Sequence, residues 1–233
     1  MKPRPYPYLV RPLRTIVRPS PEGSGHNTPP ILRINIDGTA GTGKSFLIWE
    51  ITTELCKIFQ SEHGLDPVVH LVHGWTLHFG LTLPVKKAWL PLSGSGLARS
   101  QACWNRVRLL IIDEKSMMGC TTMGKGDQRL CLIFPESSGE ILGGIPVLLF
   151  GDLAQLPPVG DSLLFSDKPS KAQSGFSDQR QRLFEAFNQK VTLQTIFRQA
   201  GEDQEQVAFW DTLLHQQTYD IAHADYELFS TWF

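Results

Sequence analysis

The stretch INIDGTAGTGKS, residues 34–45, determines how the rest of this sequence is interpreted. Its last eight residues, GTAGTGKS, fit the pattern G-x-x-x-x-G-K-[ST] of a phosphate-binding loop. The apolar, β-branched run at residues 31–36 predicts a buried strand just before the loop. A helical pattern begins after Lys44, so we expect the loop to connect a strand to a helix. The alternative interpretation is a glycine-rich turn that matches the pattern by chance.

The residue types in this loop suit a nucleoside triphosphate. Glycines let the backbone turn tightly and point its N–H groups at an anion, and the helix beginning near Gly43 adds the positive end of its dipole. Lys44 is expected to reach the β- and γ-phosphates of ATP, and Ser45 to ligate Mg²⁺. The predicted nucleotide-binding residues are Gly38, Thr39, Ala40, Gly41, Thr42, Gly43, Lys44 and Ser45.

Composition limits the class of protein. The 233 residues, 41% of them hydrophobic, suffice for one large domain or two small ones with a buried core. The net charge of −1 attracts no polyanion globally, so nucleic acid would need a local patch. Four cysteines without C-x-x-C spacing are typical of reduced thiols in an intracellular protein. No run is long and apolar enough for a membrane span or a secretory signal, so no membrane partner is expected.

Residues 1–30 differ from the remainder of the chain. They contain half of the 16 prolines, five basic residues and a single acid, Glu22. Proline at this density excludes helix and central strand, which predicts an extended or disordered arm. Either the arm contacts nucleic acid through its basic residues, or it is a solvated leader without a role.

Residues 31–233 are predicted to form one α/β domain with a mainly parallel sheet and helices on both faces. Strands are predicted at 68–72, 109–112, 145–150 and 191–193, in addition to 31–36. Helices are predicted at 45–59, 97–106, 203–214 and 221–229, with another ending near 133–134. Apolar strands that alternate with helices favour a parallel sheet, whose ligands bind at the carboxyl ends of the strands.

Polar residues follow these apolar strands where a nucleotide site needs them. Asp113, directly after an apolar strand, is expected to hold Mg²⁺, and Glu114 to orient or deprotonate the attacking water. Gln155 is suited to sensing the γ-phosphate or the water, whereas Asp152 is expected to brace that loop. The alternative for Asp113 and Glu114 is a strand that ends in two solvated acids.

Arg198 follows the last predicted strand. It is a candidate arginine finger in cis, which is typically worth about 10³–10⁵ in rate. The alternative is an ordinary surface arginine.

Four segments resemble, in order and spacing, motifs I to IV of the petite-integration-frequency (PIF) type DNA helicases of superfamily 1B, related to RecD. They are IDGTAGTGKSFLI (36–48), LLIIDEKSMMG (109–119), GGIPVLLFGDLAQLPPVGD (143–161) and TLQTIFRQAGED (192–203). The motif sequences are especially similar to those of the copies carried by fungal Helitron transposons. The resemblance covers roughly residues 31–229.

The resemblance implies a RecA-like motor domain that uses ATP and Mg²⁺ to move 5′ to 3′ on single-stranded DNA. It implies that Lys44 and Ser45 bind phosphate and metal, that Asp113 and Glu114 form the acidic box, and that Gln155 is the sensor. Arg198 corresponds to the motif IV arginine. An intracellular and nuclear setting is expected, with mitochondria as the alternative, and roles in DNA repair, recombination and telomere maintenance are implied.

Three features depart from the family pattern. The first glutamine is Gln60, so the adenine-reading glutamine upstream of the loop is missing or replaced. The second predicted strand leads directly into residues 72–78, without the motif Ia loop that binds DNA in this family. A second RecA-like domain with motifs V and VI is absent from the 233 residues, so we expect this chain alone to bind ATP and hydrolyse it slowly without unwinding DNA. A degenerate remnant that only binds nucleotide or DNA is the alternative.

Contacts with DNA are predicted from aromatic and basic residues. Trp75, His78 and Phe79 could stack on bases, but core packing beside a shortened loop is the favoured interpretation. Lys86 and Lys87 are candidates for phosphate contacts on charge alone. Nothing in the residues fixes the oligomeric state.

Overall fold

The computed structural model describes residues 31–63, 68–72, 78–84, 89–152, 155–165 and 180–195, and residues 208, 211, 212, 215, 222, 223, 226 and 227. The predicted arm at residues 1–30 lies outside these residues. Most of the two predicted closing helices also lies outside them.

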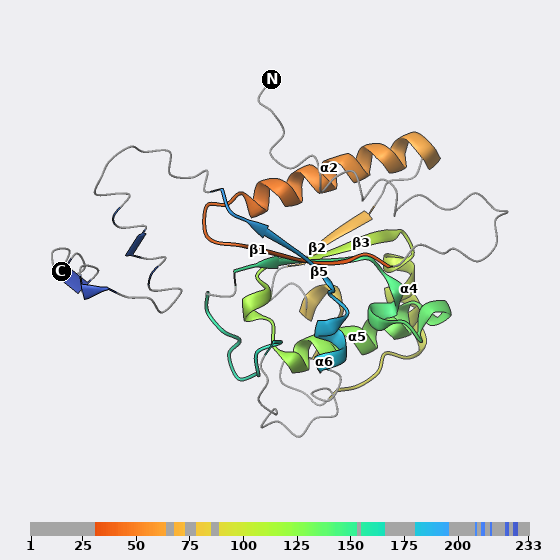
Figure 1. The fold of residues 1–233 in the computed structure, drawn as a ribbon. Coiled ribbons are helices and arrows are strands. Elements are labelled where there is room, and N and C mark those ends of the chain that lie inside the picture. The colour runs from red at the N-terminus through yellow and green to blue at the C-terminus, as the bar shows by residue number, and fades with distance from the viewer. Residues whose placement is uncertain are drawn as a thin grey trace.

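A five-stranded sheet with the order β2-β3-β4-β1-β5 forms the centre of the domain (Figure 1). All paired strands are parallel. The predicted parallel α/β architecture is therefore confirmed. The strands are β1 (Arg33–Gly38), β2 (Val68–Val72), β3 (Val107–Ile112), β4 (Val147–Gly151) and β5 (Gln189–Leu193).

Helices cover both faces of this sheet. Helix α2 (Lys44–His63) lies on one face, and α4 (Gly94–Trp104), α5 (Cys120–Ile133) and α6 (Arg180–Glu185) lie on the other (Figure 1). The chain leaves β1 toward one face and β4 toward the other, and these two strands are neighbours. Ligands in open parallel sheets bind where the topology switches in this way.

Side-chain alternation divides the core into two layers. Ile34 and Ile36 of β1 pack with Leu47, Ile48 and other apolar residues of α2. On the opposite face, Leu110 and Ile112 of β3 and Val147 and Leu149 of β4 pack against apolar residues of α5, among them Met123, Leu130 and Ile133. Asn35 and Asp37 alternate with the isoleucines of β1 and therefore face the α5 layer.

Short turns that periodicity did not predict complete the fold. The described residues contain three 3-10 turns: η1 (Lys115–Met117), η2 (Pro135–Ser137) and η3 (Ile141–Gly144). The helix α6 was also not predicted, and α4 begins three residues earlier than expected. Turn η1 matters most for function because it directly follows Asp113 and Glu114.

Candidate functional site

The phosphate loop, residues 38–45, has the cradle shape that its sequence predicts. Gly41 and Gly43 both adopt a left-handed φ of 84°, which favours glycine. The hydroxyl of Thr42 donates to the carbonyl of Thr39 at 2.8 Å. The loop ends where α2 begins at Lys44, as expected.

Lys44 closes the loop on itself. Its ammonium donates to the carbonyl oxygens of Gly38 at 2.7 Å and Thr39 at 3.0 Å. The ammonium is thus held over the loop, where a bound phosphate would compete with the two carbonyls for it. The contact between Lys44 and phosphate stays a prediction.

Gly38 leaves room for the loop to fold back. A Cβ at this position would lie 2.4 Å from Oγ1 of Thr42 and 3.2 Å from Cβ of Leu193. Thr42 is only 1% exposed, so its side chain has little space to move. Any larger residue at position 38 would therefore distort the cradle.

The acidic turn, residues 113–118, lies at the carboxyl end of β3. Asp113 is buried, with 6% of its surface exposed, and its Oδ1 accepts the backbone N–H of Glu114 at 2.9 Å. Glu114 has φ 56° and ψ 45°, in the left-handed region that a residue with a Cβ rarely adopts. The backbone N–H of Met117 then donates to the Glu114 carbonyl at 3.0 Å and closes the turn.

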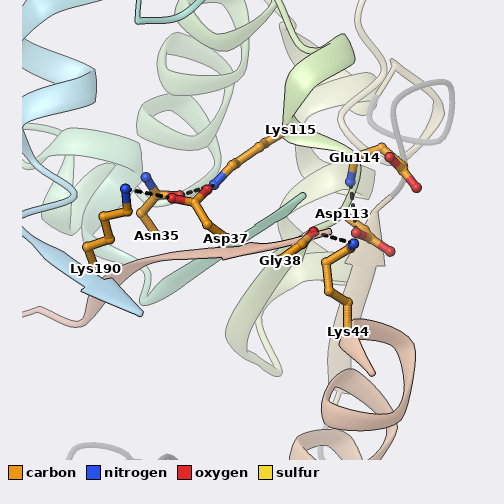
Figure 2. Close-up of polar contacts among 8 residues, drawn as sticks. All are labelled: Asn35, Asp37, Gly38, Lys44, Asp113, Glu114, Lys115 and Lys190. Carbon is orange, nitrogen blue, oxygen red and sulfur yellow. Dashed lines mark hydrogen bonds and ion pairs between the residues drawn. The ribbon is translucent and has the colours of Figure 1, made fainter. Parts of the chain in front are cut away.

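The sheet brings the phosphate loop and the acidic turn to the same edge, because both follow the carboxyl ends of parallel strands. Figure 2 shows Asp113 and Glu114 at the end of the sheet where Lys44 meets Gly38. Ser45 is exposed in the first turn of α2. The hydroxyl of Ser45 and the carboxylate of Asp113 are hard oxygen donors of the kind that Mg²⁺ prefers.

The third strand end carries Asp152 and Gln155. Asp152 follows β4, and its carbonyl accepts the backbone N–H of Gln155 at 3.2 Å. The side chain of Gln155 is exposed, so it is available to a ligand at this edge. Arg198 lies outside the described residues, and its role stays a prediction.

A buried lysine bridge was missed by the sequence analysis. Lys115, only 4% exposed, donates from Nζ to Oδ1 of Asn35 and Oδ1 of Asp37 (Figure 2). Lys190 of β5 reaches the other oxygen of Asp37 at 3.0 Å. Burial lowers the pKa of Lys115, while the hydrogen bond and the charge of Asp37 oppose that shift. Two polar residues alternating within the apolar β1 run were the signal that could have predicted this bridge.

Asp161 is a second group that the motif alone does not explain. Its carboxylate accepts the backbone N–H groups of Thr121 at 3.0 Å and Thr122 at 3.2 Å, in the first turn of α5. The backbone N–H of Cys120 donates to the carbonyl of Ser162 at 2.9 Å. The loop after β4 therefore caps the helix that follows the acidic turn.

The predicted DNA contacts are only partly covered by the described residues. Phe79 is 82% exposed, so the expectation that it fills the core is wrong. It lies in the helical residues 78–80, and the backbone N–H groups of Thr82 and Leu83 donate to the carbonyls of Phe79 and His78. His78 is half-buried. Trp75, Lys86 and Lys87 lie outside the described residues.

A pocket of about 560 Å³ lies on the α5 face, lined by Trp89, Asp127, Cys131, Glu140 and Arg182 among others. Burial raises the pKa of the Asp127 carboxyl and of the Cys131 thiol. The described residues of the phosphate loop and the acidic turn do not line this pocket, so it is separate from the candidate nucleotide site.

The described residues form neither a metal cluster nor a membrane-spanning helix. Within the described ranges, no group of three or more His, Cys, Asp or Glu side chains could hold a metal ion. No described helix has the length and hydropathy that crossing a membrane requires.

Comparison with protein families gives one match across most of the chain. Residues 32–222 match the family model described as PIF1-like helicase. The ATP-dependent DNA helicase PIF1 of Emericella nidulans is 32% identical over 132 residues, which are 52% of this chain and 17% of that protein. The ATP-dependent DNA helicase PIF1 of Saccharomyces cerevisiae is 27% identical over 191 residues, 77% of this chain and 20% of that protein.

Solved structures share the fold. Pif1 helicase from Candida albicans has a TM-score of 0.61 at 21% identity, covering 94% of this chain and 44% of that chain. A Bacteroides Pif1 bound to single-stranded DNA has a TM-score of 0.59 at 20% identity, covering 98% and 50%. A Bacteroides Pif1 in complex with ADP-AlF3 and single-stranded DNA has a TM-score of 0.56. The chain spans about half the length of these structures and about a fifth of the two curated relatives.

Proposed function

The chain belongs to the PIF1-like helicase family, and from that premise we propose that it binds ATP with Mg²⁺ at the edge formed by β1, β3 and β4. Hydrolysis of this ATP is coupled to movement along single-stranded DNA in the 5′ to 3′ direction, as part of a DNA helicase. The names of the relatives, which are ATP-dependent DNA helicases, support the reaction class.

One observation carries this proposal. The fold places a phosphate loop with Lys44 over its cradle and an acidic turn with Asp113 and Glu114 at one edge of a parallel sheet (Figure 2). Phosphoryl transfer to water needs positioning and charge stabilisation more than covalent chemistry. These two segments supply the cation, the metal ligands and the carboxylate that this reaction uses.

Each segment has a distinct part in the reaction. The backbone N–H groups of the phosphate loop and the ammonium of Lys44 bind the phosphates. Ser45 and Asp113 hold Mg²⁺, which neutralises charge on the transferring phosphoryl group when it is bound. Glu114 orients the attacking water and accepts its proton. Gln155, exposed on the loop after β4, contacts the γ-phosphate or that water.

Binding of single-stranded DNA, the coarser part of this proposal, is supported by the crystal structures of Bacteroides Pif1 with single-stranded DNA. Phe79 is the described aromatic candidate for stacking on a base, since it is 82% exposed. Base stacking on an aromatic side chain is worth about 1–3 kcal/mol and tolerates any sequence.

Steady-state ATP hydrolysis with and without single-stranded DNA tests the proposal. We compare the wild type with Lys44→Gln and with Lys57→Gln, a matched change on the same helix. Lys57 is an exposed residue whose ammonium pairs with a carboxylate oxygen of Glu54 at 3.0 Å. Lys44→Gln is expected to lower the DNA-stimulated rate about 10²–10³-fold, as loss of one transition-state donor does, and Lys57→Gln to leave it unchanged.

Two outcomes would contradict the proposal in different ways. Equal wild-type rates with and without DNA would remove the coupling and leave a nucleotide-binding remnant. Equal loss of rate in both lysine variants would show that the charge of Lys44 has no specific part in hydrolysis.

A further inference from the structure

The lysine bridge connects the two halves of the candidate site through the interior of the protein. Lys115 begins η1, directly after Glu114, and its ammonium ends on Asn35 and Asp37 of β1 (Figure 2). Asp37 directly precedes Gly38, the first residue of the phosphate loop. One side chain therefore joins the turn that follows β3 to the strand that leads into the loop.

The bridge crosses a strand on its way. Strand β4 lies between β3 and β1, and Gly151 of β4 pairs in register with Asp37. A Cβ on Gly151 would lie 2.8 Å from Cγ of Lys115 and 2.9 Å from its backbone nitrogen. The absence of a side chain at position 151 lets Lys115 reach β1, so the bridge involves all three strands whose ends form the site.

The strained backbone of Glu114 explains why the acidic turn needs such a bridge. Its left-handed backbone is strained, and a strained residue persists only where its surroundings hold it in place. Asp113 holds Glu114 from one side through the hydrogen bond to its N–H group. On the other side the next residue is Lys115, whose buried side chain fixes the start of η1 to β1.

We propose that Lys115 is a positioning residue, which holds Asp113 and Glu114 at a fixed place relative to the phosphate loop. This inference rests on the proposed function, since it assigns a role within the same ATP site. Lys115 itself touches no reacting atom. It acts through Asp37 and Asn35 on one side and through the backbone of Glu114 on the other.

The composition of the bridge fits a positional role. The ammonium of Lys115 is compensated within the interior by the carboxylate of Asp37 and the amide oxygen of Asn35. Lys190, whose side chain is 62% exposed, supplies a second cation to the same carboxylate. Asp37 thus keeps a partner when Lys115 is removed, so Lys115 can be replaced without leaving the half-buried carboxylate of Asp37 unpaired.

Lys190→Met is the matched control for Lys115→Met. Both changes remove one lysine from Asp37, but Lys190 belongs to β5, and its described ion pair joins it to Asp37 rather than to the acidic turn. In the full 233-residue chain, Lys115→Met is expected to lower kcat for ATP hydrolysis about 10–100-fold with KM for ATP changed less than about twofold, because misplacement affects the transition state. Lys190→Met is expected to leave both constants near the wild-type values.

Amide hydrogen exchange provides a readout that does not depend on activity. Lys115→Met is expected to speed exchange in residues 113–118 and to leave residues 38–45 as in the wild type. The double variant Asp37→Asn/Lys115→Met removes both charges of the ion pair and provides a second variant in case Lys115→Met alone does not fold. It is expected to fold and to keep the low kcat.

The outcomes separate the two proposals. Wild-type exchange in residues 113–118 of folded Lys115→Met, or wild-type kcat in the folded double variant, would overturn the role of Lys115. If the wild-type chain hydrolyses no ATP but Lys115→Met shows faster exchange in residues 113–118, the proposed function is rejected and the role of Lys115 in holding the turn is upheld.

Discussion

The phosphate loop follows β1 and the acidic turn follows β3, at the same edge of one sheet. Different kinds of contact hold these two segments in shape. Within the loop, Thr42 and Lys44 bond to carbonyls three to six residues away. The acidic turn is held by Asn35 and Asp37, which are 80 and 78 residues from Lys115. Its following helix is capped by Asp161, 40 residues from Thr121. The loop is a local structure, whereas the turn depends on the assembled fold.

This difference has a consequence for how each region tolerates change. A disturbed local structure can be repaired by a second change nearby in the sequence. A disturbed assembled structure requires a partner from another strand or loop. Variants at Glu114, at the two glycines 38 and 151, and at Asp161 test this distinction.

Glu114 is expected to show the largest effect, because it combines a chemical role with a strained backbone. Glu114→Gln and Glu114→Asn both remove the carboxylate and should lower the rate of ATP hydrolysis about 10²–10⁴-fold. Asparagine tolerates the left-handed region, so Glu114→Asn should also raise the free energy of unfolding by about 0.5–1 kcal/mol. Glutamine should not. Chemical denaturation and ATPase assays on both variants measure the two effects.

Equal stabilities for these two variants would show that the backbone at Glu114 stores no strain. The acidic turn would then owe its shape to its own residues, as the phosphate loop does, and the contrast between the two regions would fail.

Two glycines provide the next largest effect and compare the regions directly. Gly38→Ala and Gly151→Ala each force a Cβ into occupied space and should each cost about 1–3 kcal/mol of unfolding free energy. The obstacle at position 38 is mainly Oγ1 of Thr42, so adding Thr42→Ala should recover most of the loss. At position 151 the backbone nitrogen of Lys115 is also in the way, at 2.9 Å, so adding Lys115→Ala should recover little.

Thermal or urea denaturation of the two single and the two double variants measures the loss and the recovery of unfolding free energy. Recovery of Gly151→Ala by Lys115→Ala would mean that the lysine side chain alone occupies the space, and that the turn adjusts as readily as the loop.

The same distinction explains what the sequence could predict. The phosphate loop, Asp113 and Glu114 are recognisable because each is a short run of residues after an apolar strand. The parallel sheet follows from the alternation of strands and helices. These features depend on neighbours in the chain, and their positions in the structure agree with the expectation.

The lysine bridge was missed because it depends on residues that are distant in the sequence. Nothing next to Lys115 in the sequence indicates that its side chain crosses β4, because that path requires Gly151 and the register between β1 and β4. Phe79 was expected in the core because it is aromatic. Its residue type alone does not show which residues surround it. Short 3-10 turns such as η1 are too brief to show a period.

Asp161 offers the smallest effect and the most specific test of long-range support. Its carboxylate accepts two N–H groups in the first turn of α5, a position normally capped by the residue before the helix. That residue is Gly119, which makes no side-chain bond, and a Cβ there would collide with Asp161. Asp161→Ala should therefore cost about 1 kcal/mol of unfolding free energy, as loss of a helix cap does.

Asp161→Asn separates the hydrogen bonds from the charge. The amide oxygen can still accept a backbone N–H group, so this variant should keep more than half of the stability that Asp161→Ala loses. Urea denaturation of both variants at low and high salt provides the comparison, since screening weakens only the charge–dipole part. If Asp161→Ala were as stable as the wild type, α5 would hold its first turn without help from the loop after β4, and the support of the acidic turn would reduce to the lysine bridge alone.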